Sequence, residues 1–128
     1  MQLRVAGAPY RLRDPEAAVA VLIGRSTASS AEVIAAAFAA RGASRSFGAP
    51  TRGATTGTRI FELGDGAALV LAVAATSDRN GRLYAGPIAP DEPSDTRDRE
   101  RPLAEQAAIR TARHWLESLE TCRASTPR

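Results

Sequence analysis

The feature that most constrains the fold is an apolar run that stops at a glycine and is followed closely by an alanine-rich segment. Residues 19–23 are continuously apolar and partly β-branched, which predicts a parallel strand buried on both faces. Residues 30–41, with Gly42 as a stop, read as a helix that is apolar nearly all round and therefore buried. A buried strand leading directly into a helix predicts an α/β domain.

The turn between these elements reads Ser26-Thr27-Ala28-Ser29-Ser30-Ala31-Glu32. Ser29 and Glu32 have the S-x-x-E spacing of a capping box, in which each side chain accepts a free N–H of the other residue. The same turn also suits a nucleophile, because the unpaired N–H groups of a first helical turn point toward any anion formed beside them. The spacing alone favours the cap, and the two interpretations are compatible.

The rest of the chain alternates short strands with loops before a final helix. A short strand is expected at 44–47, and a β-hairpin at 58–63 and 67–76 around Gly64-Asp65-Gly66. The second hairpin strand is apolar on both faces and is expected to be central. Residues 85–102, which are rich in proline and charge, are predicted to be a surface connection. An amphipathic helix is expected at 102–120, with one apolar side formed by Ala104, Ala108, Ala112, Trp115 and Leu119.

A length of 128 residues predicts one domain. We expect residues 1–18 to be an extended lead-in or edge strand, 19–121 to form the domain, and 122–128 to be a disordered tail. The first residues lack a signal-peptide pattern, and no run approaches the roughly 20 apolar residues of a membrane span. The chain as given is therefore expected to be cytoplasmic and away from membranes, or periplasmic or secreted if it is a fragment of a longer precursor.

The basic character of the chain does not predict nucleic-acid binding. All 17 basic residues are arginines, and they are spread out and interleaved with acidic residues, as in residues 95–101. No basic stripe with aromatic stacking residues is present in the sequence. We therefore expect solvated charges and no nucleic-acid partner.

No metal or cofactor site is expected from the sequence. One cysteine, Cys122, and one histidine, His114, give no ordinary ligand spacing, and a single cysteine forms no internal disulfide. Residues 78–81 have the D-x-N-G spacing of a calcium loop, but the position where such a loop needs glutamate is Ala89. An Asn-Gly turn is the better interpretation.

Several motifs in a fixed order resemble one protein family. They are Thr-Ala-Ser-Ser-x-Glu, a Gly-x-Pro-Thr loop, the Asp-Gly hairpin, an Asn-Gly-Arg turn and Gly-Pro-Ile-x-Pro-Asp. From about Val19 to Asp91 the chain resembles the C-terminal half of the catalytic domain of the tail-specific, or C-terminal processing, serine peptidases. The branch near tricorn core peptidase and interphotoreceptor retinoid-binding protein is included. The resemblance implies a bacterial protein with a partial domain of the ClpP/crotonase fold, built from stacked ββα units.

The resemblance also implies roles for particular residues. The family nucleophile falls on Ser29, and the backbone N–H of Ser30 would form half of the oxyanion hole, while Glu32 remains the helix cap. The lysine base of the main branch falls on Ala54, and the chain contains no lysine. His114 lies on the polar face of the last helix and is not assigned as the base. No Gly-Gly pair, which such peptidases use for the rest of the oxyanion hole, precedes Ser29.

Two functions therefore remain open. The first is peptide-bond hydrolysis through Ser29, with the base supplied by a missing upstream segment or a second subunit, so that the isolated chain is expected to be inactive. The alternative is a catalytically inactive module on the same fold that binds a peptide or a lipophilic ligand. A peptide or protein substrate is the expected partner of the first function, and neither function requires a cofactor.

Overall fold

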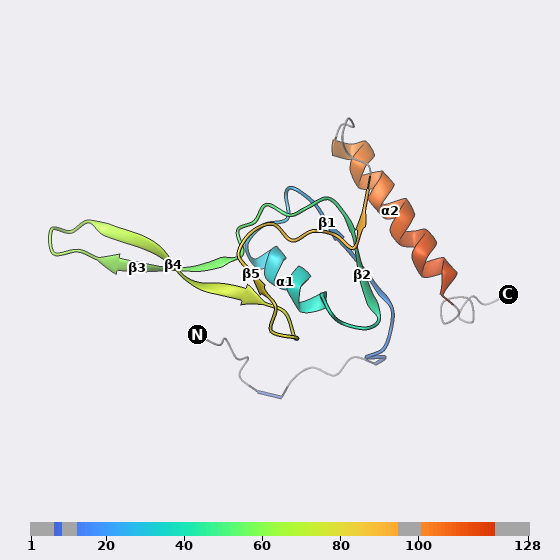
Figure 1. The fold of residues 1–128 in the computed structure, drawn as a ribbon, viewed down its shortest axis with the longest axis horizontal. Coiled ribbons are helices and arrows are strands. Elements are labelled where there is room, and N and C mark those ends of the chain that lie inside the picture. The colour runs from blue at the N-terminus through green and yellow to red at the C-terminus, as the bar shows by residue number, and fades with distance from the viewer. Residues whose placement is uncertain (1–6, 9–12, 95–100, 120–128) are drawn as a thin grey trace.

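The fold combines two small sheets with two helices in a computed structural model that describes residues 7–8, 13–94 and 101–119 (Figure 1). One sheet has the strand order β1-β2-β6 and the other β3-β4-β5. This mixed architecture confirms the predicted α/β class. The elements in chain order are β1 (Val19–Ile23), α1 (Ser30–Phe38), β2 (Ser44–Gly48), β3 (Thr56–Glu62), β4 (Ala68–Ser77), β5 (Leu83–Tyr84), β6 (Glu92–Pro93) and α2 (Arg101–Ser118).

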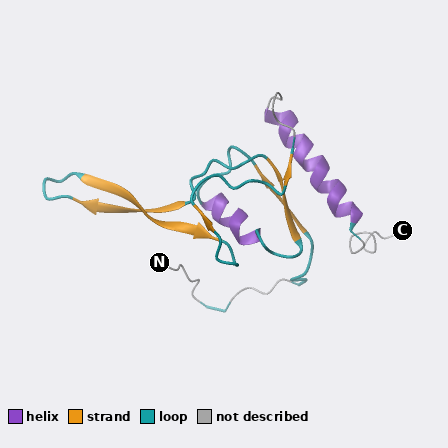
Figure 2. Ribbon diagram, viewed as in Figure 1, coloured by secondary structure: helices purple, strands orange, loops and turns teal. Residues whose placement is uncertain are grey.

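The first sheet is built on the predicted strand–helix–strand unit. Strand β1 pairs in parallel with β2, from Val19 opposite Ser44 to Ile23 opposite Gly48. Helices α1 and α2 flank this pair on different sides (Figure 2). The parallel strand is confirmed, but it is not buried on both faces as expected, because Leu22 is 49% exposed.

The packing of α2 confirms the amphipathic helix predicted at the end of the chain. Ala108 and Ala112 are buried on the side that faces β1 and β2. Trp115 places its ring against that of Phe47, which is fully buried in β2, with the ring centroids 5.6 Å apart. The alanines let the helix approach the sheet closely, and the aromatic pair fills the remaining space.

Helix α1 differs from its prediction in length and in burial. It ends at Phe38 instead of Arg41, and Ala40 takes the left-handed conformation, with φ 59°, that closes the helix. Val33 and Ile34 are more than half exposed, because only one side of this short helix meets the sheet. The expectation of burial nearly all round was therefore wrong.

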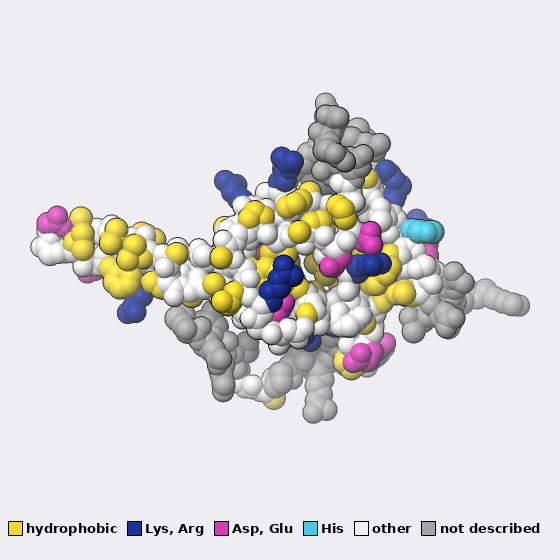
Figure 3. Space-filling view, in the orientation of Figure 1, with side chains coloured by type: hydrophobic (Ala, Val, Ile, Leu, Met, Phe, Trp, Pro, Cys, Tyr) yellow, Lys and Arg dark blue, Asp and Glu magenta, His cyan; other side chains and the backbone are white. Residues whose placement is uncertain are grey.

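The predicted hairpin is confirmed as the antiparallel pair β3–β4, which extends from the body as a two-stranded arm (Figure 1). Strand β4 is the middle strand of its sheet, as expected. Hydrophobic side chains gather along the arm at the surface (Figure 3). The large apolar residues of the arm are between 37% and 66% exposed, and they are Ile60, Phe61, Leu63, Leu69, Val70, Leu71 and Val73.

The segment between Asp78 and Tyr84 forms the predicted Asn-Gly turn. Gly81 has φ 82°, which the turn requires, and its N–H donates to the carbonyl oxygen of Asp78. The Asp78 carboxylate accepts the N–H groups of Asn80 and Arg82 and the Tyr84 hydroxyl, at 2.9, 3.0 and 3.1 Å. Protein donors thus occupy both oxygens of this carboxylate, in agreement with a turn.

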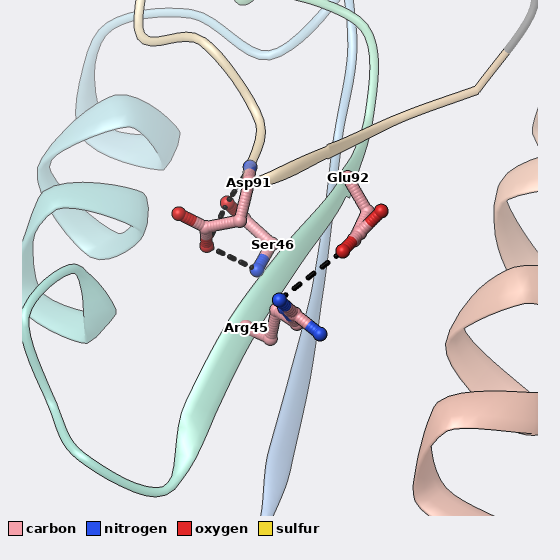
Figure 4. A network of polar contacts seen from close by, with 4 residues as sticks. All are labelled: Arg45, Ser46, Asp91 and Glu92. Carbon is pink, nitrogen blue, oxygen red and sulfur yellow. Dashed lines mark hydrogen bonds and ion pairs between the residues drawn. The ribbon is translucent and has the colours of Figure 1, made fainter.

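The predicted surface connection contains a short strand, β6, that the sequence did not indicate. Ser46 and Asp91 hold it to β2, because the Ser46 N–H and hydroxyl donate to the Asp91 carboxylate at 2.8 and 2.7 Å (Figure 4). The Asp91 N–H donates back to the Ser46 hydroxyl oxygen at 2.9 Å, and Arg45 pairs with Glu92 at 3.2 Å. This pairing fixes the path of the chain past the end of β2.

The boundaries proposed near residues 18 and 121 stay predictions. Most of the lead-in at 1–18 and the whole tail at 122–128 lie outside the described residues. Among the helices that are described, none combines the length and the hydropathy of a membrane-crossing helix.

Candidate functional site

Ser29 stands at the tip of the turn between β1 and α1 in an uncommon backbone conformation. Its φ is 54° and its ψ is −121°, and its side chain is exposed. A non-glycine residue with positive φ is strained by about 1–3 kcal/mol, and such strain is concentrated at functional sites. A serine on a strained strand-to-helix turn is the arrangement by which many hydrolases present a nucleophile to solvent.

Glu32 lies fully buried behind this turn and ties it to a second segment. Its Oε2 accepts the Ser29 N–H at 2.8 Å, and its Oε1 accepts the Thr51 hydroxyl and, at 2.7 Å, the Gly53 N–H. Burial raises the pKa of this carboxyl, but the hydrogen bonds from Thr51, Gly53, Ser29 and Ala54 outweigh burial and lower it. The group is therefore ionised near neutral pH, where it positions the turn and is unsuited to act as a general base.

Hydrogen bonds to two other segments hold the Gly-x-Pro-Thr loop beside the Glu32 carboxylate. The Thr51 N–H donates to the Ile88 carbonyl oxygen at 3.0 Å, and the Ile88 N–H donates to the Thr51 hydroxyl oxygen at 2.8 Å. The Arg52 N–H donates to the Thr27 carbonyl oxygen at 2.9 Å, which joins the loop to the serine turn. Ala54, where the resemblance places a lysine, lies three residues after Thr51 of this loop.

The backbone N–H of Ser30 has no acceptor in the residues that the structure describes. The next three N–H groups of the turn are all used, because Ala31 donates to the Ala28 carbonyl oxygen and Glu32 and Val33 donate to that of Ser29. The free N–H therefore sits at the positive end of α1, directly after Ser29. It is available to an anion that forms there.

No base approaches Ser29 in the described part of the chain. His114 is exposed on α2, which packs against β1 and β2 on a different side from α1. The chain has no lysine, and Glu32 is engaged in the contacts described above. Among residues 7–8, 13–94 and 101–119, no three side chains of the His, Cys, Asp and Glu types gather as a metal site. The structure thus brings together Ser29, Ser30 and Glu32 but not His114.

Two features of the site were missed by sequence reasoning. The first is the strained conformation of Ser29, for which the sequence holds no signal, since strained turns are normally marked by glycine. The second is a hollow beside the turn that is lined by Arg25, Pro50, Thr51 and Arg52. The sequence does hold a signal for this hollow, because Arg25 adjoins the serine turn and Arg52 adjoins the Gly-x-Pro-Thr loop, but the spread of arginines along the chain obscures it.

Comparison with known proteins identifies one family. The family model of Peptidase family S41 matches residues 6–94. A solved structure of a lipoprotein from Streptococcus agalactiae is 33% identical, with a TM-score of 0.60, over 79% of this chain and 32% of that chain. The chain therefore spans about a third of the length of that solved relative. No curated protein gave a match.

Proposed function

Because the chain belongs to peptidase family S41, we propose that it carries the nucleophile-bearing part of a serine peptidase site. Membership confirms the family resemblance in the sequence motifs and supports the ClpP/crotonase-like fold. The observation that carries the proposal is the strained, exposed backbone position of Ser29 at the start of α1. That position costs folding energy, and serine occupies it although glycine would adopt the same φ without strain.

In the proposed reaction the Ser29 Oγ attacks the carbonyl carbon of a peptide bond. The carbonyl oxygen becomes an oxyanion, which accepts the free Ser30 N–H at the positive end of α1. The proton of Ser29 passes to a base supplied from outside this chain, by an upstream segment or a second subunit, and the base then protonates the leaving amine. Water releases the acyl group in the second half of the reaction. The role of Glu32 is to position Ser29.

An activity-based probe tests the nucleophile directly. An adduct formed on incubation with a fluorophosphonate is expected on Ser29, located by mass spectrometry, because the turn exposes this hydroxyl beside an oxyanion donor, and it is expected to form slowly because the base lies outside this chain. Ser29→Ala should abolish the adduct. Ser26→Ala, which removes another exposed hydroxyl from the same turn, should retain it. Labelling that persists in Ser29→Ala would contradict the proposal.

The second candidate is a catalytically inactive module that binds a peptide or a lipophilic ligand on the same fold. It is favoured by the complete lack of lysine and by the exposure of His114 away from the turn. This candidate predicts no fluorophosphonate adduct together with a ligand that remains bound through purification. Hydrolysis of an unstructured peptide by the pure chain would exclude it.

The strain at Ser29 gives a stability prediction. Ser29→Gly is expected to be about 1 kcal/mol more stable than Ser29→Ala, because glycine adopts positive φ without strain whereas alanine does not. Urea unfolding followed by circular dichroism measures the difference. Equal stability, or a more stable alanine variant, would show that the turn conformation is not strained.

A further inference from the structure

The arm formed by β3 and β4 consists of only two strands over most of its length. Strand β4 pairs with β3 along residues 68–75, and it pairs with β5 only at Thr76 and Ser77. The arm extends away from the body (Figure 1), and hydrophobic side chains gather along its surface (Figure 3). A ribbon of two strands is marginally stable in water, whereas a third strand stabilises it. In the described part of the chain, no strand pairs with the outer edge of β4 over residues 68–75.

The two strands of the arm differ in charge. Strand β3 carries Arg59 and Glu62, whereas none of the 10 residues of β4 is charged. Charged side chains on edge strands are a common means by which proteins prevent association with another strand. Strand β3 therefore has the composition of a free edge, and β4 has that of a strand paired on both sides.

The backbone of β4 presents hydrogen-bonding groups along its outer edge. At the tip of the arm the Leu63 N–H donates to the Ala67 carbonyl oxygen at 2.8 Å. In an antiparallel pair, successive residues direct their N–H and C=O groups alternately toward the paired strand and away from it. Because Ala67 bonds to β3, the backbone groups of Ala68, Val70 and Ala72 point away from β3. These three residues can pair with a further strand.

The outer edge of β4 is complementary to itself. Residues 68–72 read Ala-Leu-Val-Leu-Ala, which is the same sequence in both directions. When two copies pair antiparallel about Val70, each of these residues lies opposite one of its own type, so that Leu69 faces Leu71 of the second copy. Ile60, which lies opposite Val70 in β3, continues the central row on the same face of the sheet. Neither of the two central strands is charged, so the edge fits a second copy of itself without electrostatic repulsion.

The chain exposes enough surface for such an interface. Its accessible surface is 10205 Å², whereas a compact protein of 13.4 kDa exposes roughly 6,500 Å². The difference is several times the area of about 800 Å² that each partner contributes to a standard interface. The apolar side chains of the arm contribute to this excess, since Val70 is 59% exposed and Val73 is 55% exposed.

We propose that the outer edge of β4 joins two copies of this chain, which pair antiparallel about Val70. The two arms then form one four-stranded sheet in the order β3-β4-β4-β3, with the uncharged strands inside and the charged strands at the edges. The two-fold axis passes between the two Val70 residues. The proposal concerns assembly alone and does not depend on the proposed function of Ser29.

Sedimentation equilibrium of the 128-residue chain measures this assembly. A dimer of twice the chain mass of 13.4 kDa is expected to form as the protein concentration rises. Val70→Lys places two like charges opposite each other at the two-fold axis, so it is expected to weaken dimerisation at least about tenfold. Val33→Lys introduces the same charge at a similarly exposed valine on α1 and should leave dimerisation unchanged.

Mixing two variants separates loss of the interface from loss of the fold. Val70→Glu alone is expected to weaken dimerisation as Val70→Lys does. An equimolar mixture of the two variants should restore the dimer, because opposite charges then meet at the axis. A variant that had failed to fold could not be rescued in this way.

Three results would overturn the proposal. The first is a wild-type chain that stays monomeric at every concentration, which would assign the free edge to a different partner. The second is a dimer that Val70→Lys leaves intact or that Val33→Lys weakens equally, because the interface would then lie elsewhere or the effect would reflect net charge alone. The third is a mixture of Val70→Lys and Val70→Glu that dimerises no better than its components.

Discussion

Replacing Glu32 with alanine is expected to lower the free energy of unfolding by about 4 kcal/mol, a large part of the stability of a domain of this size. The carboxylate is fully buried and accepts the Ser29 N–H, the Thr51 hydroxyl and the Gly53 N–H. Its removal leaves those donors unpaired and opens a space under the serine turn. Urea unfolding, monitored by circular dichroism, measures the loss.

Two further variants make this expectation specific. Glu32→Gln keeps the shape of the side chain but replaces one acceptor oxygen with a donor, so a smaller loss of about 2 kcal/mol is expected. Glu62→Ala, at an exposed position in β3, removes the same charge and should change stability by less than about 0.5 kcal/mol. A loss below about 1 kcal/mol in Glu32→Ala would contradict the proposed role of this carboxylate.

The pH dependence of stability provides a second measurement on Glu32. Its hydrogen bonds hold the pKa of the folded state below the ordinary value of 4.5, so the unfolded chain binds this proton more readily than the folded chain. The stabilisation is therefore fully present above about pH 4.5 and is lost as the pH falls through that value toward the folded pKa. Glu32→Gln should lose this acidic component of the pH dependence.

Gly48→Ala is expected to cost at least about 4 kcal/mol and to prevent folding of most of the chain. Gly48 has φ 126°, and a Cβ placed there would lie 2.1 Å from the carbonyl oxygen of Ile23 and 3.2 Å from its carbonyl carbon. Those atoms belong to the backbone of the paired strand β1, which has no rotamer to change. The Ser94 N–H also donates to the Gly48 carbonyl oxygen at 2.8 Å, so any shift disturbs a third segment.

Gly64→Ala is the matched control for this substitution. A Cβ added at Gly64 would have no heavy atom within 4 Å, and the φ of Gly64 is not positive, so its replacement should change stability by less than about 0.5 kcal/mol. Soluble expression and thermal unfolding of the two variants compare them directly. Native-like unfolding of Gly48→Ala would show that β1 and β2 can separate at this point without losing the fold.

The sequence was most informative where the structure depends on neighbouring residues. The parallel strand at 19–23, the start of the helix at Ser30 and the hairpin around Gly64-Asp65-Gly66 follow from periodicity and turn residues. The spacing of Ser29 and Glu32 likewise indicated the contact between the Ser29 N–H and the glutamate carboxylate.

The features that sequence reasoning missed arise between segments far apart in the chain. Nothing near Glu32 indicates that its second oxygen binds Thr51 and Gly53, because that loop is positioned by the pairing of β1 with β2. The helix prediction to Arg41 counted alanines, which favour helix locally, whereas the return toward β2 ends the helix at Phe38. Local propensity is a weak guide where tertiary connections decide the boundary.

The aromatic contact between α2 and β2 makes the last helix observable by light emission. Trp115 is the one tryptophan of the chain, and its ring lies against fully buried Phe47. Indole emission responds to the polarity around the ring, so it reports whether α2 is docked on the sheet. The circular dichroism signal, by contrast, sums over every helix and strand. Comparing the two signals during unfolding therefore tells whether α2 detaches from the sheet before the rest of the secondary structure is lost or together with it.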